Sequence, residues 1–178
     1  MRYPLSSTLL LLTLMPAVAV AQNPPTDLSD PEVAHVAVTA DNIDIDFGKL
    51  ALSRTKDSEV KNFASMMVRD HTGVNEKAAA LAKKLGVTPK DNAVSQSLEA
   101  GAKDAKAKLD PLKGSDFDRA YIEHEIAYHQ AVLDALNQTL IPTTENAELK
   151  GLLTQVTSAI EAHLAYAKKI GAKVQASK

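Results

Sequence analysis

The chain has 178 residues, of which 45% are hydrophobic, 24% charged and only 4% aromatic, a profile typical of one soluble globular domain. Its 20 basic and 22 acidic side chains nearly balance, and no basic run is long enough to hold a polyanion, so nucleic acid is not expected as a partner. Because cysteine is absent, disulfides, thiolate metal sites and a catalytic cysteine are excluded, and any metal must be held by imidazole and carboxylate groups.

The first residues predict export. Arg2 precedes a short apolar run over residues 9–14, and the small residues 19–21 match a cleavage site, so we expect a signal peptide over residues 1–21 with cleavage after Ala21. The run is too short, and too interrupted by Pro16, to act as a membrane anchor. The mature protein is therefore expected to be periplasmic or secreted, without a transmembrane anchor.

Next along the chain, residues 22–29 contain two prolines and are expected to form a flexible tether. Residues 30–175 are expected to form one helical domain, because apolar side chains recur there at spacings of three and four. Asp30-Pro31 and Asp57 are typical helix starts, and Gly86 and Gly171 typical ends. The predicted helices cover about residues 30–55, 58–85, 92–109, 115–140 and 145–170.

The predicted fold is all-α, because no segment alternates apolar and polar residues as a strand does. Four of the helices are about 20 residues or longer, which at about 1.5 Å per residue makes rods of about 30 Å. Rods joined by short loops pack as an antiparallel four-helix bundle. The helix over 92–109 has a thinner apolar stripe and is expected to be an additional shorter helix that crosses over or lies on one face, while Gly48 allows close backbone approach.

Three of the five histidines, His71, His129 and His163, fall on the apolar stripes of three different helices. Their neighbours at a spacing of three or four residues are mostly apolar, so all three imidazoles should point inward. The other two, His35 and His124, are expected near the end of the bundle and at its surface or rim.

A buried imidazole needs partners for both ring nitrogens. Glu125 lies one turn before His129, Asp70 is beside His71, and Asp44 or Asp46 on the first helix flanks the apolar stripe. Three imidazoles with one to three carboxylates predict a site for iron, copper, zinc or manganese. The candidate ligands are His71, His129, His163, Glu125, Asp70 and Asp44.

Two other interpretations stay open. The same residues fit a buried polar network that sets the register of the helices, in a non-catalytic structural or interaction module with a partner in the cell envelope. They also fit a metal-dependent oxidase or peroxidase, although none of the trio has the Glu three residues earlier that a di-iron helix carries, and no nucleophile elbow is present. No catalytic residue is therefore assigned, and a non-enzymatic role is favoured.

Several segments resemble an uncharacterised bacterial family. They are residues 44–51, 60–64, 67–72, 85–87 and 114–122, together with His129 and residues 163–164. The most specific are the Asp70-His71 pair after a Met-Val run and the Phe-Asp-Arg-Ala-Tyr block over 117–121. The family is domain of unknown function 4142, and the resemblance covers about residues 35–170.

The resemblance implies an exported protein of the cell envelope with a ferritin-like helical bundle, and the inward residues Asp70, His71, His129 and His163. It implies no established activity, so storage, sensing and protection against stress are all compatible with it. The chain departs from the family pattern at Asp44, where Glu is usual, which shortens the reach to a shared site, and at Gly73, which weakens the second helix by about 1 kcal/mol relative to Ala.

Overall fold

The computed structural model describes residues 27–176, and within that range every regular element is a helix, as predicted. The elements are α1 (Asp30–Arg54), α2 (Ser58–Leu85), α3 (Ala93–Leu109), α4 (Gly114–Ala135), the π-helical turn η1 (Leu136–Leu140), α5 (Ile141–Thr143) and α6 (Ala147–Ala176). The predicted signal peptide lies outside the described residues. Among the described helices, none combines the length and hydropathy that a membrane-spanning segment requires.

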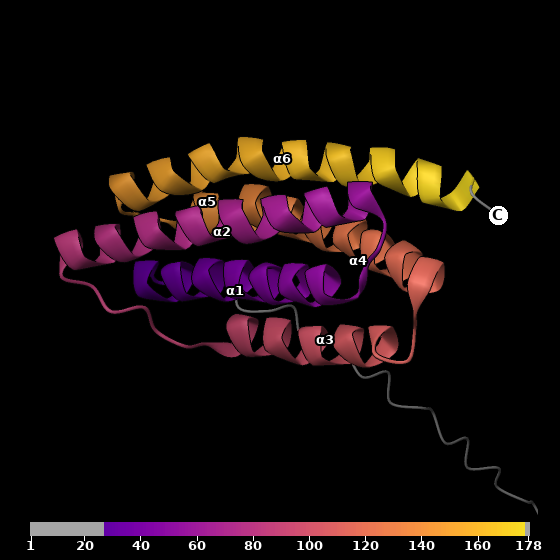
Figure 1. Cartoon of the computed structure of the whole chain (residues 1–178). Coiled ribbons are helices and arrows are strands. Elements are labelled where there is room, and N and C mark those ends of the chain that lie inside the picture. The colour runs from indigo at the N-terminus through magenta and orange to yellow at the C-terminus, as the bar shows by residue number, and fades with distance from the viewer. Residues whose placement is uncertain (1–26, 177–178) are drawn as a thin grey trace, which may run out of the picture.

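The four long helices α1, α2, α4 and α6 lie side by side, and α3 lies outside them (Figure 1). α1 packs most extensively on α2, and α4 on α6, while α3 packs mainly on α1. Residues 55–57 and 144–146 are tight reversals, so α1 and α6 run one way and α2 and α4 the other. α3 carries the chain back along the bundle, which allows α2 and α4 to be parallel.

Local signals explain where the helices begin and end. The Asp57 carboxylate accepts the N–H groups of Glu59 and Val60 at the start of α2, and Gly86 ends that helix with a φ of 65°. Ser29 and Glu32 form a capping box at the start of α1, and Leu28 is buried. Leu28, near the end of the predicted tether, thus packs into the helical core, and Ser29 caps α1 at the surface.

Two predicted helix ends differ from the structure. Gly171 does not end α6, which continues to Ala176. Gly171 is buried against α4, where an added Cβ would lie 3.0 Å from Cδ1 of Ile126, so the glycine serves close packing and not termination. After α4 the chain stays helical through the π-helical turn η1 and through α5 to Thr143, so the helical stretch continues past the predicted end at about residue 140 and includes Pro142.

The core consists of two apolar clusters separated by a polar layer. The first gathers at the end where α1 passes to α2 and includes Phe47, Phe63 and Tyr121. The second gathers at the opposite end and includes Val33, Leu136 and Leu153. Six buried side chains that can carry charge lie along the same helices between them: Asp41, Asp44, His71, Glu125, His129 and His163. Such a layer is costly unless its groups satisfy one another or a ligand.

Candidate metal centre

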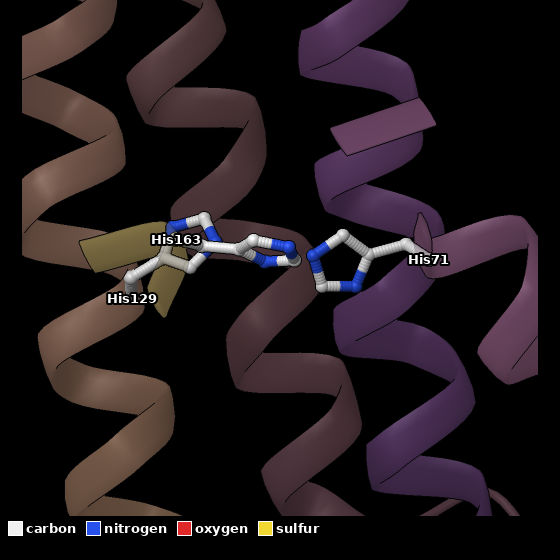
Figure 2. Close-up of side chains that lie close together, drawn as sticks. All are labelled: His71, His129 and His163. Carbon is white, nitrogen blue, oxygen red and sulfur yellow. The ribbon is translucent and has the colours of Figure 1, made fainter. Parts of the chain in front are cut away.

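The structure brings the three inward histidines together. His71 comes from α2, His129 from α4 and His163 from α6, with exposed fractions of 3%, 0% and 4%. Their ring centroids are 5.4 to 5.9 Å apart, and each ring offers a nitrogen such that the three nitrogens lie within 4.8 Å of one another. Figure 2 shows the three rings turned toward a common point between the helices.

One nitrogen of each ring lies at hydrogen-bond distance from an oxygen atom of another residue. His129 Nδ1 donates to the backbone carbonyl of Glu125 at 2.9 Å, and Nε2 of His163 lies 3.1 Å from Oδ2 of Asp70. His71 Nδ1 lies 2.6 Å from Oδ1 of Asp41. Since a carbonyl oxygen only accepts, His129 carries its hydrogen on Nδ1, which leaves the lone pair on Nε2.

The remaining nitrogen of each ring is buried without a hydrogen-bond partner: Nε2 of His71, Nε2 of His129 and Nδ1 of His163. A buried polar atom that lacks a partner is destabilising by about 1–3 kcal/mol. Metal-ligating histidines show the same division, with one nitrogen on the metal and the other on a carboxylate or carbonyl. Each of the three imidazoles thus has one nitrogen held by an oxygen atom and one that a metal ion could use.

Two buried carboxyl groups complete the surroundings of these nitrogens. Asp44, on α1, places Oδ2 3.0 Å from Nε2 of His71 and 3.3 Å from Nε2 of His129, without hydrogen-bond alignment to either. Glu125 lies 3.4 Å from His129 through Oε2, and neither of its carboxylate oxygens has a hydrogen-bond partner. Asp44, Glu125 and His129 also offer ligand atoms within 4.8 Å of one another, so oxygen donors are available beside the imidazoles.

The charges of this layer are unevenly distributed. Burial opposes protonation of His71, but the hydrogen bond with Asp41 and the negative charges of Asp44 and Asp41 overcome it and raise the pKa of His71 to about 10. Burial lowers the pKa of His129 to about 4 and also lowers the pKa of His163. In the metal-free protein His71 is therefore an imidazolium between two aspartates and would release a proton on becoming a ligand, while the other two rings are neutral at pH 7.

The pKa values of the buried carboxyl groups are also shifted in opposite directions. Burial raises the pKa of Glu125, and the neighbouring charge of Asp44 raises it further. Burial also opposes the ionisation of Asp44, but His71 and His129 outweigh it and lower the pKa of Asp44. Burial thus favours the neutral form of Glu125 and also raises the pKa of Asp41, whereas Asp44 is held ionised, and a bound divalent cation would favour the ionised form of all three carboxyl groups.

The other sequence-predicted residues lie farther out. The Asp70 side chain is 31% exposed and holds His163 from the rim, where it also accepts from Nε of Arg69 at 2.7 Å. Asp46 does not lean into the bundle; it is exposed and pairs with Lys49. His124 is half-buried and lies against the ring of Phe47, and His35 is 3.9 Å from Asp91 at the start of the bundle.

Sequence reasoning missed Asp41, which holds Nδ1 of His71. A signal was present, because Asp41, Asp44, Gly48 and Ala51 recur at helical spacing and all four are buried. None of the four is a large apolar residue, so the stripe through Ile43 and Phe47 concealed this second inward face.

Three comparisons with known proteins place these observations in context. A family model described as Domain of unknown function (DUF4142) matches residues 15–170. A solved structure, "CopM in the Cu(II)-bound form", has a TM-score of 0.62 and 16% sequence identity, over 83% of this chain and 98% of that chain. At that identity the likeness is one of fold alone. A search of curated proteins found no match.

Proposed function

The chain belongs to the DUF4142 family, and we propose that it is an exported helical-bundle protein that binds one divalent transition-metal ion through His71, His129 and His163. The observation that carries the proposal is a set of three buried imidazoles, each with one ring nitrogen that makes no hydrogen bond and each offering a nitrogen within 4.8 Å of the other two. Asp44 and Glu125 would add oxygen ligands, and Asp41 and Asp70 would orient the rings of His71 and His163.

Copper is the metal that the chemistry favours. Imidazole nitrogen suits copper, zinc and iron, carboxylate oxygen suits manganese, and divalent copper binds most tightly to a given set of such donors. CopM, a protein of similar fold, was solved in a Cu(II)-bound form, which supports copper as the first metal to test. The role that follows is storage, sensing or sequestration that protects the envelope, and no substrate or catalytic residue is assigned.

The helix directions support a ferritin-like topology. α2 and α4 are parallel because α3 forms a single long crossover, and ferritin-like folds have one such connection. The ligand pattern is different, since the trio lacks the Glu-x-x-His pairs of di-iron proteins. We therefore propose a histidine-rich centre within a ferritin-like bundle.

Export rests on residues 1–21, whose positive start, apolar run and small-residue cleavage site are typical of a signal peptide. The test is the mass of the protein recovered from the periplasm or medium of a bacterial host. A chain that begins at Gln22 is the expected product, and full-length protein retained in the cytoplasm would contradict export.

Metal binding is tested on protein purified without an affinity tag. We expect one equivalent of Cu(II) in a competition titration, with nitrogen hyperfine coupling in the electron paramagnetic resonance spectrum. The triple variant His71→Ala, His129→Ala, His163→Ala should retain less than about a tenth of an equivalent, because nitrogen supplies most of the affinity for copper. The matched control is His35→Ala, which removes a histidine far from the centre and should leave one equivalent bound.

A second candidate function is a structural or interaction module in which the same layer is a polar network. The hydrogen bond between Nδ1 of His71 and Asp41, at 2.6 Å, favours it, since this pair is satisfied by a proton alone. The two functions predict different melting behaviour. A network predicts a melting temperature that does not respond to Cu(II), whereas a metal centre predicts a rise that grows with metal concentration.

A further inference from the structure

An apolar cavity of about 100 Å³ lies beside the polar layer, within the second apolar cluster. All four long helices contribute to its wall, with Ala37 from α1, Ala78 from α2, Val132 from α4 and Leu153 from α6. Small side chains on α1 and α2 leave space that larger residues would fill. Leu81 of α2 and Leu152 of α6 also line it and are only half-buried, so the cavity reaches the surface between these two helices.

The wall offers few polar side chains, namely Asp30, Asp41 and Asn146, and Oδ1 of Asn146 accepts the N–H groups of Glu148 and Leu149. Its acidic members, Asp30 and Asp41, are engaged elsewhere: Asp30 accepts the N–H groups of Glu145 and Asn146, and Asp41 binds His71. None of the buried polar atoms without a partner, among the described residues, belongs to a lining residue. Because an ordered water needs two to four polar partners, and the polar side chains of this wall are already hydrogen-bonded to other groups, the space is suited to an apolar occupant.

The inner wall of the cavity adjoins the proposed metal centre. Val74 follows His71 by three residues, Val132 follows His129 by three, and Ile160 precedes His163 by three. Each of these lining residues is therefore about one helical turn, or about 5 Å along the axis, from a proposed ligand. An occupant of the cavity would lie against the same helical turns that carry the imidazoles.

We propose that this cavity is a binding site for a small uncharged apolar molecule, no larger than a single aromatic ring. An apolar cavity of about 150 Å³ binds benzene or xenon, and one water occupies about 30 Å³, so 100 Å³ holds one small hydrocarbon. No buried polar atom of the wall lacks a partner, so a polar or charged ligand would lose its hydration without compensation. The proposal concerns a different part of the bundle from the metal centre and does not depend on metal binding.

The test uses benzene as the probe on the full mature chain, with methyl-labelled nuclear magnetic resonance as the readout. Benzene should shift the methyl signals of Val74, Val132 and Ile160 and raise the melting temperature. The variant Ala78→Leu fills the cavity and should bind benzene at least about tenfold more weakly, since the probe and the new side chain compete for one volume. The matched control is Ala80→Leu, an exposed position on the same helix outside the lining, which should bind as the native chain does.

A second variant keeps the test decisive if Ala78→Leu fails to fold. Leu153→Ala enlarges the cavity and should bind benzene more tightly than the native chain does. Equal binding by native chain, Ala78→Leu and Leu153→Ala would overturn the proposal, as would the absence of any shift at saturating benzene. Cu(II) stoichiometry is measured on the same samples, so failure of the cavity proposal and failure of the metal proposal are separately visible.

Discussion

Asp41 holds the ring of His71 in place, although it is not itself among the proposed ligands. Its Oδ1 lies 2.6 Å from Nδ1 of His71, and both side chains are buried. Asp41→Asn removes the charge that orients the ring, so we expect Cu(II) affinity to fall about 10- to 100-fold, the usual effect of losing such a partner. Competition titration measures this.

Asp46→Asn is the matched control, because Asp46 lies on the same helix but is exposed. It should leave the affinity unchanged. Equal affinities in the two variants would show that Asp41 does not support the metal centre.

The raised pKa of His71 predicts that the free energy of unfolding depends on pH. Its pKa is raised to about 10 in the folded protein, above the usual value near 6.5 of the unfolded chain. The folded state therefore binds the proton more tightly, and this contribution to stability is fully present below about pH 6.5 and is lost as the pH rises toward 10. Urea denaturation of the metal-free protein should show a decreasing free energy of unfolding over that window.

His71→Gln provides the comparison, because it removes the titrating group and should flatten the same slope. His129, whose pKa is lowered to about 4, acts in a separate window below pH 6.5, where its protonation on unfolding reduces stability. A slope above pH 6.5 that is identical in native and variant proteins would assign it to another group.

At the residue scale, helical periodicity predicted the three histidines of the polar layer. His71, His129 and His163 occupy positions where large apolar residues recur, so a polar side chain there is expected to point inward. Asp41 and Asp44 belong to a face of small and polar residues, so periodicity alone ranked Asp44 no higher than Asp46. Which of two flanking carboxylates turns inward depends on the rotation of α1 against α2, a tertiary property that one helix does not encode.

At the scale of elements, α1 and α2 pack closely at one glycine. A Cβ on Gly48 would lie 2.8 Å from Cγ2 of Val68 and 3.1 Å from the carbonyl oxygen of Ala64, so the helices would have to separate. We expect Gly48→Ala to destabilise the protein by about 1–3 kcal/mol, the usual effect of overpacking. Gly73 on α2 has open space around it, so Gly73→Ala should stabilise by about 0.5–1 kcal/mol.

Chemical denaturation of both variants measures these opposite signs, and a stabilising Gly48→Ala would mean that the contact is easily relieved. The sequence predicted close backbone approach at Gly48 and a weakened helix at Gly73, and the space around each glycine agrees with these predictions. The packing between elements separates a glycine that permits contact from one that merely loosens a helix. At Gly171 the sequence instead indicated a helix end, although this glycine is a contact with α4.

At the scale of the whole molecule, the four long helices share the polar layer and α3 does not. Ser95 and Leu109 are the only buried residues of α3, and the helix is tied to α1 by Arg54, which donates to the carbonyl oxygen of Leu109 at 3.1 Å. A helix with so little buried surface should open without the rest of the bundle. Its amides should exchange with solvent at least about tenfold faster than those at the centre of α1.

Metal loading then separates local from global opening. A ligand that binds only the folded state, at a free concentration about 100 times its dissociation constant, adds about 2.7 kcal/mol to the free energy of global unfolding. Amides near His71, His129 and His163 exchange only when the centre is disrupted, so Cu(II) should slow them by about 100-fold. Amides of α3 exchange through an opening that leaves the centre intact, so their rates should not change. Equal slowing of α3 would mean that this helix unfolds only together with the bundle, and hydrogen exchange with mass spectrometry decides between the two.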